Sequence, residues 1–183
     1  MVQRCAWVHD DSLEQQYHDT KWCRPKHDDQ QLFMWLILEI MQAGLSWVTI
    51  LHKQMAMQTA FDQFDYRLIA HYDENKIAEL MQNAQIIRNR RKLTAMVNNA
   101  QVFLRVQQQF GSFDHYLWGL VDNQVQQNSW STTTQVPAKS PLSERIAIQF
   151  KQLGFQFVGP TIIYSYLQAV GVINDHQQNC AFR

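Results

Sequence analysis

The chain has 183 residues, 46% of them hydrophobic, and its 16 Lys and Arg residues balance its 16 Asp and Glu residues. This length suits one compact domain with a sizeable core, so we treat 1–183 as a single domain. With zero formal net charge, the protein has no overall positive potential that would attract polyanions, so any surface that binds nucleic acid must be a local one. We find neither a signal-peptide pattern nor a stretch long enough to span a bilayer, which predicts a cytoplasmic protein without membrane contact.

Helical periodicity and capping residues recur along the chain and no alternating strand pattern persists, which predicts an all-α fold. The segment 123–140 is rich in Gln, Asn, Ser and Thr and is predicted to be a loop. In chain order, the expected helices are 12–18 capped by Ser12, a central helix capped by Asp28 or Asp29, one from 47 onward, 66–72, one capped by Asp73, 87–109, 112–121, 141–153 and 160–170.

The stretch 32–47, LFMWLILEIMQAGLSW, contains a single charged side chain, Glu39. Helical spacing places Trp35 one turn before Glu39 on the same face, so we expect the carboxyl group to point inward. Gly44 can end this helix in the left-handed conformation, and Ser46 can cap a second helix. Two interpretations stay open: a carboxyl group that awaits a ligand in a pocket, or a core acid that bonds a loop amide.

The three cysteines are too few for a disulfide framework. His176 and Cys180 have the i, i+4 spacing with which one helical turn presents two ligands to a metal ion. Two further ligands would come from the N-terminal segment, either Cys5 with His18 or Cys23 with His27. An ordinary histidine and a buried cysteine account for the pair equally well.

A second cluster lies in 80–98, where two predicted helices meet at a short hairpin followed by Arg88, Arg90, Arg91 and Lys92. Backbone amides at a helix N-terminus and nearby cations form an anion site, so a phosphate backbone could bind here. A solvated basic face is the alternative.

Seven short motifs run through nearly the whole chain: C-x-W at Cys5 and Trp7, YHD at 17–19, LE at 38–39, QAGLSW at 42–47, IIRNR at 86–90, FVGPT at 157–161 and NDH at 174–176. Together they resemble the DNA-3-methyladenine glycosylase I family, helix-hairpin-helix enzymes that excise N3-methylated adenine from DNA. The resemblance implies a helical glycosylase domain with its hairpin at 74–100. It also implies a zinc site that joins the terminal segments 1–27 and 171–183.

The residue roles that follow are those implied by the resemblance. The zinc ligands match Cys5, His18, His176 and Cys180, which decides against Cys23 and His27. The base pocket matches Glu39, Tyr17 and Trp47, with Trp7 and Trp22 as walls. Glu39 would be the catalytic residue, whose carboxylate accepts hydrogen bonds from the damaged base, and Trp47 would stack on that base.

The implied substrate is double-stranded alkylated DNA bound by a monomer. Water would release 3-methyladenine and leave the strand intact, because no lysine nucleophile is evident. The corner geometry and the family likeness together suggest Leu45 as the side chain that fills the vacated base stack. The expected DNA-binding residues are Gln42, Gly44, Leu45, Arg88, Arg90 and Lys92.

Four residues depart from the family pattern: Cys23 and Gln85 stand where glycine is usual, Glu14 where an aromatic is common, and Lys21 where an acid is usual. We expect Gln85 to lie at positive φ, which would strain the hairpin and weaken DNA binding. A divergent paralogue that binds DNA without excising bases is the alternative function, and a zinc-stabilised interaction domain is a third.

Overall fold

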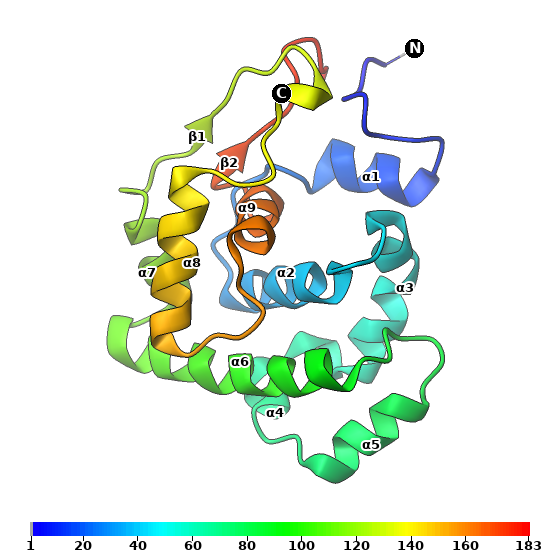
Figure 1. The fold of residues 1–183 in the computed structure, drawn as a ribbon, viewed down its shortest axis with the longest axis vertical. Coiled ribbons are helices and arrows are strands. Elements are labelled where there is room, and N and C mark those ends of the chain that lie inside the picture. Colours follow the sequence, from blue (N-terminus) through cyan, green and yellow to red (C-terminus); the bar gives the residue numbers. More distant parts are fainter. Residues whose placement is uncertain (1) are drawn as a thin grey trace.

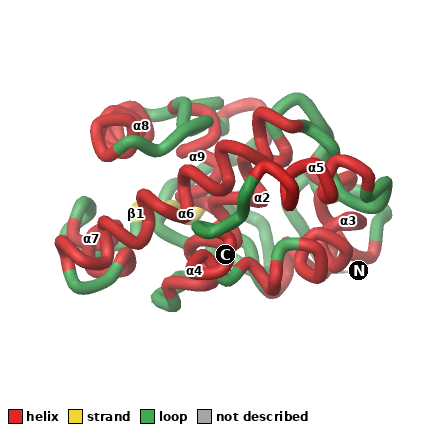
Figure 2. The backbone as a smooth tube through the Cα atoms, turned by 90° about the horizontal axis from the view of Figure 1, so that it is seen from below, coloured by secondary structure: helices red, strands yellow, loops and turns green. Residues whose placement is uncertain are grey.

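The computed structural model describes residues 2–183 and is almost entirely helical (Figure 1), with two very short strands (Figure 2). This confirms the predicted all-α class. The helices are α1 (Ser12–Thr20), α2 (Asp29–Gln42), α3 (Trp47–Ala60), α4 (Tyr66–Ile69), α5 (Glu74–Gln82), α6 (Arg90–Phe110), α7 (Phe113–Gly119), α8 (Pro141–Leu153) and α9 (Pro160–Ala169), with 3₁₀ turns η1 (Asp62–Phe64) and η2 (Thr133–Gln135).

Helix α2 lies at the centre of the molecule and contacts α3, α6, α7 and α9 (Figure 1). A helix that is apolar on every side is stable only when neighbours cover all of its faces, and α2 meets this requirement. Its apolar residues are buried: Leu32, Phe33, Trp35, Leu36, Ile37, Leu38, Ile40 and Met41. The most apolar stretch of the sequence is therefore the structural centre of the fold.

Most of the predicted helix boundaries agree with the structure. Asp28 caps α2 through the backbone N–H of Gln31, and Ser46 caps α3 through that of Thr49. Some predictions are wrong by a few residues: the helix expected over 66–72 ends at Ile69, and the helix expected over 112–121 spans 113–119. Asp11, not Ser12, caps α1, because its carboxylate accepts hydrogen bonds from two backbone amides of the first turn. Helix α6 begins at Arg90 instead of 87, because the Asn89 side chain caps it.

The segment 123–140 is not only a loop. Its strand β1 (Gln126–Gln127) pairs in parallel with β2 (Ile173–Asn174), and the turn η2 follows. A strand of two polar residues has no periodicity that a sequence pattern can reveal, so its pairing depends on the partner segment. The pairing holds the 123–140 segment against the C-terminal segment.

The two terminal segments lie together at one end of the molecule (Figure 1). The backbone N–H of Ala181 donates to the carbonyl oxygen of Gln3 at 2.9 Å, and that of Ala6 donates to Oε1 of Gln177 at 2.6 Å. Among the described residues, no helix has both the length and the apolar character needed to cross a bilayer.

Gly171 lies at a close backbone contact between α9 and the segment that precedes α2. Its φ is +77°, and a Cβ there would lie 2.2 Å from the carbonyl carbon of Arg24. We therefore expect Gly171→Ala to lower the free energy of unfolding by about 3 kcal/mol. Gly111→Ala is the matched control. The φ of Gly111 is +87°, which strains any residue with a side chain, but an added Cβ there would lie within 4 Å of no atom outside the adjacent residues. It should cost about 1 kcal/mol. Chemical denaturation measures both changes, and equal losses would contradict the clash.

Candidate functional site

Glu39 is a buried carboxyl group without a hydrogen-bond partner in the described chain. The residue is 4% exposed in the third turn of α2, and burial raises the pKa of its carboxyl group to about 8. No loop amide reaches it, so the interpretation as a satisfied core acid is wrong. A buried polar group with no partner costs stability, and such groups in a cavity are typical of ligand sites.

Glu39 lines a cavity of about 230 Å³ together with the aromatic residues Trp7, Tyr17, Trp22 and Trp47. The Trp7 and Trp22 rings meet edge to face with centroids 5.0 Å apart, and the Tyr17 and Trp47 rings lie 5.0 Å apart. The cavity is smaller than a drug-sized site of roughly 300–1,000 Å³ and suits a single planar heterocycle. The structure thus brings all five predicted pocket residues together.

Four further residues also line this cavity and were not identified from the sequence: Thr133, Val136, Ser165 and Gln168. Ser165 and Gln168 are polar residues three apart on the otherwise apolar helix α9, a spacing that could have identified them. Thr133 and Val136 come from the 123–140 segment, where no sequence signal distinguishes them from other loop residues.

A larger cavity of about 450 Å³ is lined by Trp35 and by Tyr17, which also lines the smaller one. It is a polar groove lined by many glutamine side chains, and none of the unpartnered buried polar atoms belongs to a residue that lines it. We therefore place the candidate site at the smaller cavity, which holds Glu39 and the unpartnered indole nitrogens of Trp7 and Trp47.

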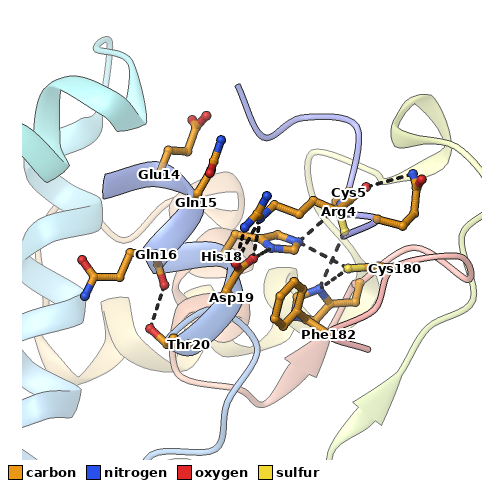
Figure 3. Close-up of polar contacts among 12 residues, drawn as sticks. Arg4, Cys5, Glu14, Gln15, Gln16, His18, Asp19, Thr20, Cys180 and Phe182 are labelled. Atoms are coloured by element: carbon orange, nitrogen blue, oxygen red, sulfur yellow. Dashed lines mark hydrogen bonds and ion pairs between the residues drawn. The ribbon is translucent and has the colours of Figure 1, made fainter. Parts of the chain in front are cut away.

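Four buried metal-type ligands converge near the chain ends: Cys5, His18, His176 and Cys180, whose ligand atoms all lie within 4.8 Å of one another. Figure 3 labels Cys5, His18 and Cys180 of this cluster. Nδ1 of His176 is 3.4 Å from Sγ of Cys180 and 3.7 Å from Sγ of Cys5, and Nε2 of His18 is 3.5 Å from Sγ of Cys180. Tetrahedral zinc with ordinary bond lengths separates nitrogen and sulfur ligands by about 3.6 Å. The four residues therefore fit one metal ion.

The surroundings of the cluster also suit a metal. Nδ1 of His18 lies 2.8 Å from the Asp19 carboxylate, which accepts hydrogen bonds from Arg4 at 2.7 to 3.0 Å (Figure 3). Such a contact fixes the histidine tautomer so that the other ring nitrogen faces the metal. Burial lowers the pKa of His176 to about 4, which keeps its ring neutral, as a metal ligand must be.

The other candidate pair, Cys23 and His27, does not join the cluster. The Cys23 thiol accepts a hydrogen bond from the backbone N–H of Asp175, and the His27 ring lies 2.8 Å from the Asp114 carboxylate. Cys23 has a φ of +56°, a conformation that favours glycine. Of the two positions where glycine is usual in the family pattern, Cys23 is therefore one where the backbone is strained.

Gln85 does not carry the strain that the sequence predicted. It is absent from the residues with positive φ, so that prediction is wrong. The Asn83 side chain accepts a hydrogen bond from the Gln85 backbone N–H at 2.9 Å, which closes a local turn at ordinary backbone angles. From α3, Nζ of Lys53 donates to the carbonyl oxygens of Ala84 and Gln85 and holds the hairpin in place.

The cations of the hairpin have different surroundings. Arg88 is exposed and forms no hydrogen bond with the described residues, whereas Arg90 pairs with Glu74 of α5. Lys92 is buried, and its ammonium group donates to the carbonyl oxygens of Met41 at 2.9 Å and Ala43 at 2.7 Å. The prediction that Lys92 binds DNA is wrong for this conformation, because its charge caps the C-terminus of α2.

The corner between α2 and α3 presents an apolar side chain to solvent. Gly44 has a φ of +80°, and Leu45, which follows it, is 43% exposed. Gln42, at the end of α2, lines the cavity. The corner therefore lies beside the pocket, with Leu45 outside it.

Comparison with known proteins matches residues 7–183 to the methyladenine glycosylase family. The chain belongs to this family. It is 38% identical over 179 residues to DNA-3-methyladenine glycosylase 1 of Escherichia coli (strain K12), covering 98% of this chain and 96% of that protein. A crystal structure of 3-methyladenine DNA glycosylase I superposes with a TM-score of 0.95 at 41% identity, covering 98% of both chains. A variant of such an enzyme in complex with 3-methyladenine gives a TM-score of 0.94 at 34% identity, covering 97% of this chain and 96% of that one.

One departure from the methyladenine glycosylase pattern has a local structural explanation. Glu14, where an aromatic side chain is common, is buried, and its Oε2 accepts the backbone N–H of His9 at 2.6 Å. The same oxygen lies 3.0 Å from Nδ1 of His9. Glu14 therefore holds the segment before α1 and does not line the cavity.

The role of Lys92 can be tested through stability. We expect Lys92→Met to lower the free energy of unfolding by about 1–3 kcal/mol, because two carbonyl oxygens lose their donor. Lys151→Met, an exposed lysine of α8, should change it by less than about 0.5 kcal/mol. Urea denaturation of both variants gives the comparison, and similar values for the two would show that the Lys92 contacts add no stability.

Proposed function

We propose that the chain is a monofunctional DNA glycosylase that flips 3-methyladenine out of alkylated double-stranded DNA and releases it by hydrolysis. The observation that carries this proposal is the unpartnered carboxyl group of Glu39 in an aromatic cavity sized for one base. The names of the relatives and the solved complex with 3-methyladenine support it.

Selectivity for the alkylated base follows from charge. Methylation at N3 makes the adenine of the nucleotide a cation, and an ionised Glu39 in a low-dielectric cavity attracts a cation more strongly than a neutral purine. The free cavity favours the protonated carboxyl group, since burial raises its pKa to about 8. Entry of the cationic base would lower that pKa and release a proton.

Bond cleavage needs little further help, because a cationic purine is a good leaving group. Trp47 and Glu39 would hold the base while water attacks a sugar with oxocarbenium character. No lysine lines the cavity within the described residues, and the buried ammonium groups of Lys26 and Lys92 donate to backbone carbonyl oxygens. We therefore expect an abasic product with an uncleaved strand.

We assign the DNA contacts to the surface around the α2–α3 corner and the hairpin. Leu45 would fill the vacated stack, assisted by Gln42, and the backbone at Gly44 would allow the corner to approach the duplex. Arg88 and Arg90 would contact phosphates without reading sequence. A monomeric state and a cytoplasmic location stay predictions.

We also propose that the metal bound by Cys5, His18, His176 and Cys180 is zinc in a structural role. Four protein ligands leave no open coordination position for chemistry, so the ion would contribute folding stability. The alternative function, a paralogue that binds DNA without excision, predicts DNA affinity with no released base.

Purified protein should release 3-methyladenine from methylated duplex DNA, and Glu39→Gln should lower single-turnover kcat/KM by about 10²–10³-fold, because the amide carries no charge. The wild-type rate should rise from pH 6 through pH 8 and level off at about pH 9, because Glu39 is half ionised at its raised pKa of about 8 and almost fully ionised about one pH unit above it. Chromatography of the released base measures both effects.

Glu144→Gln, an exposed carboxylate paired with Lys139, is the matched control and should behave as wild type. The Glu39→Gln variant should show no rise over the same pH interval. Equal release by wild type and Glu39→Gln would refute the role of Glu39. DNA binding without release by the wild type would favour the non-catalytic alternative.

Elemental analysis should find about one zinc per chain, and Cys180→Ser should lose most of it. Cys23→Ser should keep its zinc, because Cys23 lies outside the cluster. Chelation of the wild type should lower the melting temperature, because metal binding contributes folding free energy. Zinc retained by Cys180→Ser would exclude the proposed ligand set.

A further inference from the structure

One wall of the cavity comes from outside the helices that carry the family motifs. Thr133, in η2, and Val136, which follows η2, both line the cavity, and neither has been given a role so far. The hydroxyl oxygen of Thr133 is buried and has no hydrogen-bond partner in the structure. Buried hydroxyl groups are normally satisfied, so this one indicates a partner that the chain itself does not supply.

The segment that carries Thr133 is held firmly in place. Nδ2 of Asn128 and Nε1 of Trp130 donate to Oδ1 of Asp175 at 2.6 and 2.7 Å. The backbone N–H of Gln178 donates to the carbonyl oxygen of Trp130 at 2.9 Å. The hydroxyl of Thr133 is therefore positioned before any ligand binds, which reduces the entropy that binding must overcome.

Local hydrogen bonds within the turn fix it further. Oε1 of Gln135 accepts the backbone N–H groups of Ser131 at 2.7 Å and Thr132 at 3.1 Å. Asp175, to which the segment is bound, directly precedes His176 of the metal cluster. The pocket wall and the metal ligands are thus held by the same C-terminal segment.

The polar groups around the cavity complement the edge of an adenine. Adenine presents an exocyclic amino donor and ring-nitrogen acceptors. An ionised Glu39 supplies acceptors only, so it can bond the amino group but no ring nitrogen. A hydroxyl group can donate as well as accept, and the hydroxyl of Thr133 at this cavity is buried without a partner among the described residues.

We propose that Thr133 is a specificity-determining residue whose hydroxyl group hydrogen-bonds the flipped base, in addition to the contact with Glu39. This inference rests on the proposed function. Val136 lines the same cavity and would contribute apolar surface there. The 123–140 segment is then part of the binding site, a role that its loop-like sequence does not indicate.

The test compares four full-length variants with the wild type. Thr133→Val keeps the branched shape and removes the hydroxyl, Thr133→Ala removes it without adding apolar atoms, and Thr133→Ser keeps it. Thr134→Val is the matched control on the same turn, because Thr134 is exposed and its hydroxyl contacts that of Thr132. Quenching of tryptophan fluorescence gives the Kd for free 3-methyladenine, and a duplex with an abasic site measures DNA affinity.

We expect Thr133→Val and Thr133→Ala to weaken 3-methyladenine binding by about threefold to tenfold, the value of one net hydrogen bond. The Kd of Thr133→Ser and Thr134→Val for 3-methyladenine should stay within about twofold of the wild-type value, since both variants keep a hydroxyl group at position 133. Affinity for the abasic duplex and the melting temperature should not change in any variant. If Thr133 had a purely structural role, its substitution would change the affinity for the abasic duplex and the melting temperature.

Wild-type affinity in both Thr133→Val and Thr133→Ala would overturn the inference, as would equal weakening in Thr133→Ser. In either case, release of 3-methyladenine by the wild type would leave the proposed function intact. A wild type that neither binds nor releases 3-methyladenine would refute the proposed function and, with it, the role of Thr133.

Discussion

The burial of α2 on all sides is the constraint on which the rest of the structure depends. Neighbouring helices cover its apolar faces and exclude water from most of its length, so Glu39, the one carboxyl group within its apolar stretch, faces a small cavity. An unpartnered buried acid lowers stability, and a fold retains such a group where a ligand supplies the missing interaction. A rigid central helix holds that group more accurately than a loop would, which suits recognition of one charged base.

The walls of the cavity come from segments far apart in the sequence, and the C-terminal segment connects them. It pairs with β1, its Asp175 accepts hydrogen bonds from the 123–140 segment, and its His176 and Cys180 face Cys5 and His18. A metal at that cluster would hold the N-terminal segment, and with it Trp7, against the pocket. Structural metal and base recognition are therefore linked through shared backbone, although no metal ligand lines the cavity.

Only some of the cations in and around the basic hairpin are free to bind a polyanion, because others hold the structure together. Lys92 donates to carbonyl oxygens at the end of α2, and Lys53 of α3 donates to carbonyl oxygens in the turn of the hairpin. Arg88 remains exposed and without a bonded partner among the described residues, beside Arg90 and its acidic neighbour. A neutral protein can bind a polyanion with few cations if they lie on one surface, and the remaining lysines contribute by keeping that surface in position.

The sequence by itself determined the helical class, most helix boundaries, the buried position of Glu39 and, through motif likeness, the ligand cluster and the aromatic pocket. These features depend on local periodicity, capping and residue type, which are properties of short segments. Only the tertiary structure decided the direction of the Lys92 ammonium group, the ordinary backbone of Gln85, the positive φ of Cys23 and the place of Thr133 in the cavity wall. Each of these depends on which distant segment supplies the hydrogen-bond partner or the packing surface, and no local pattern in the chain records that choice.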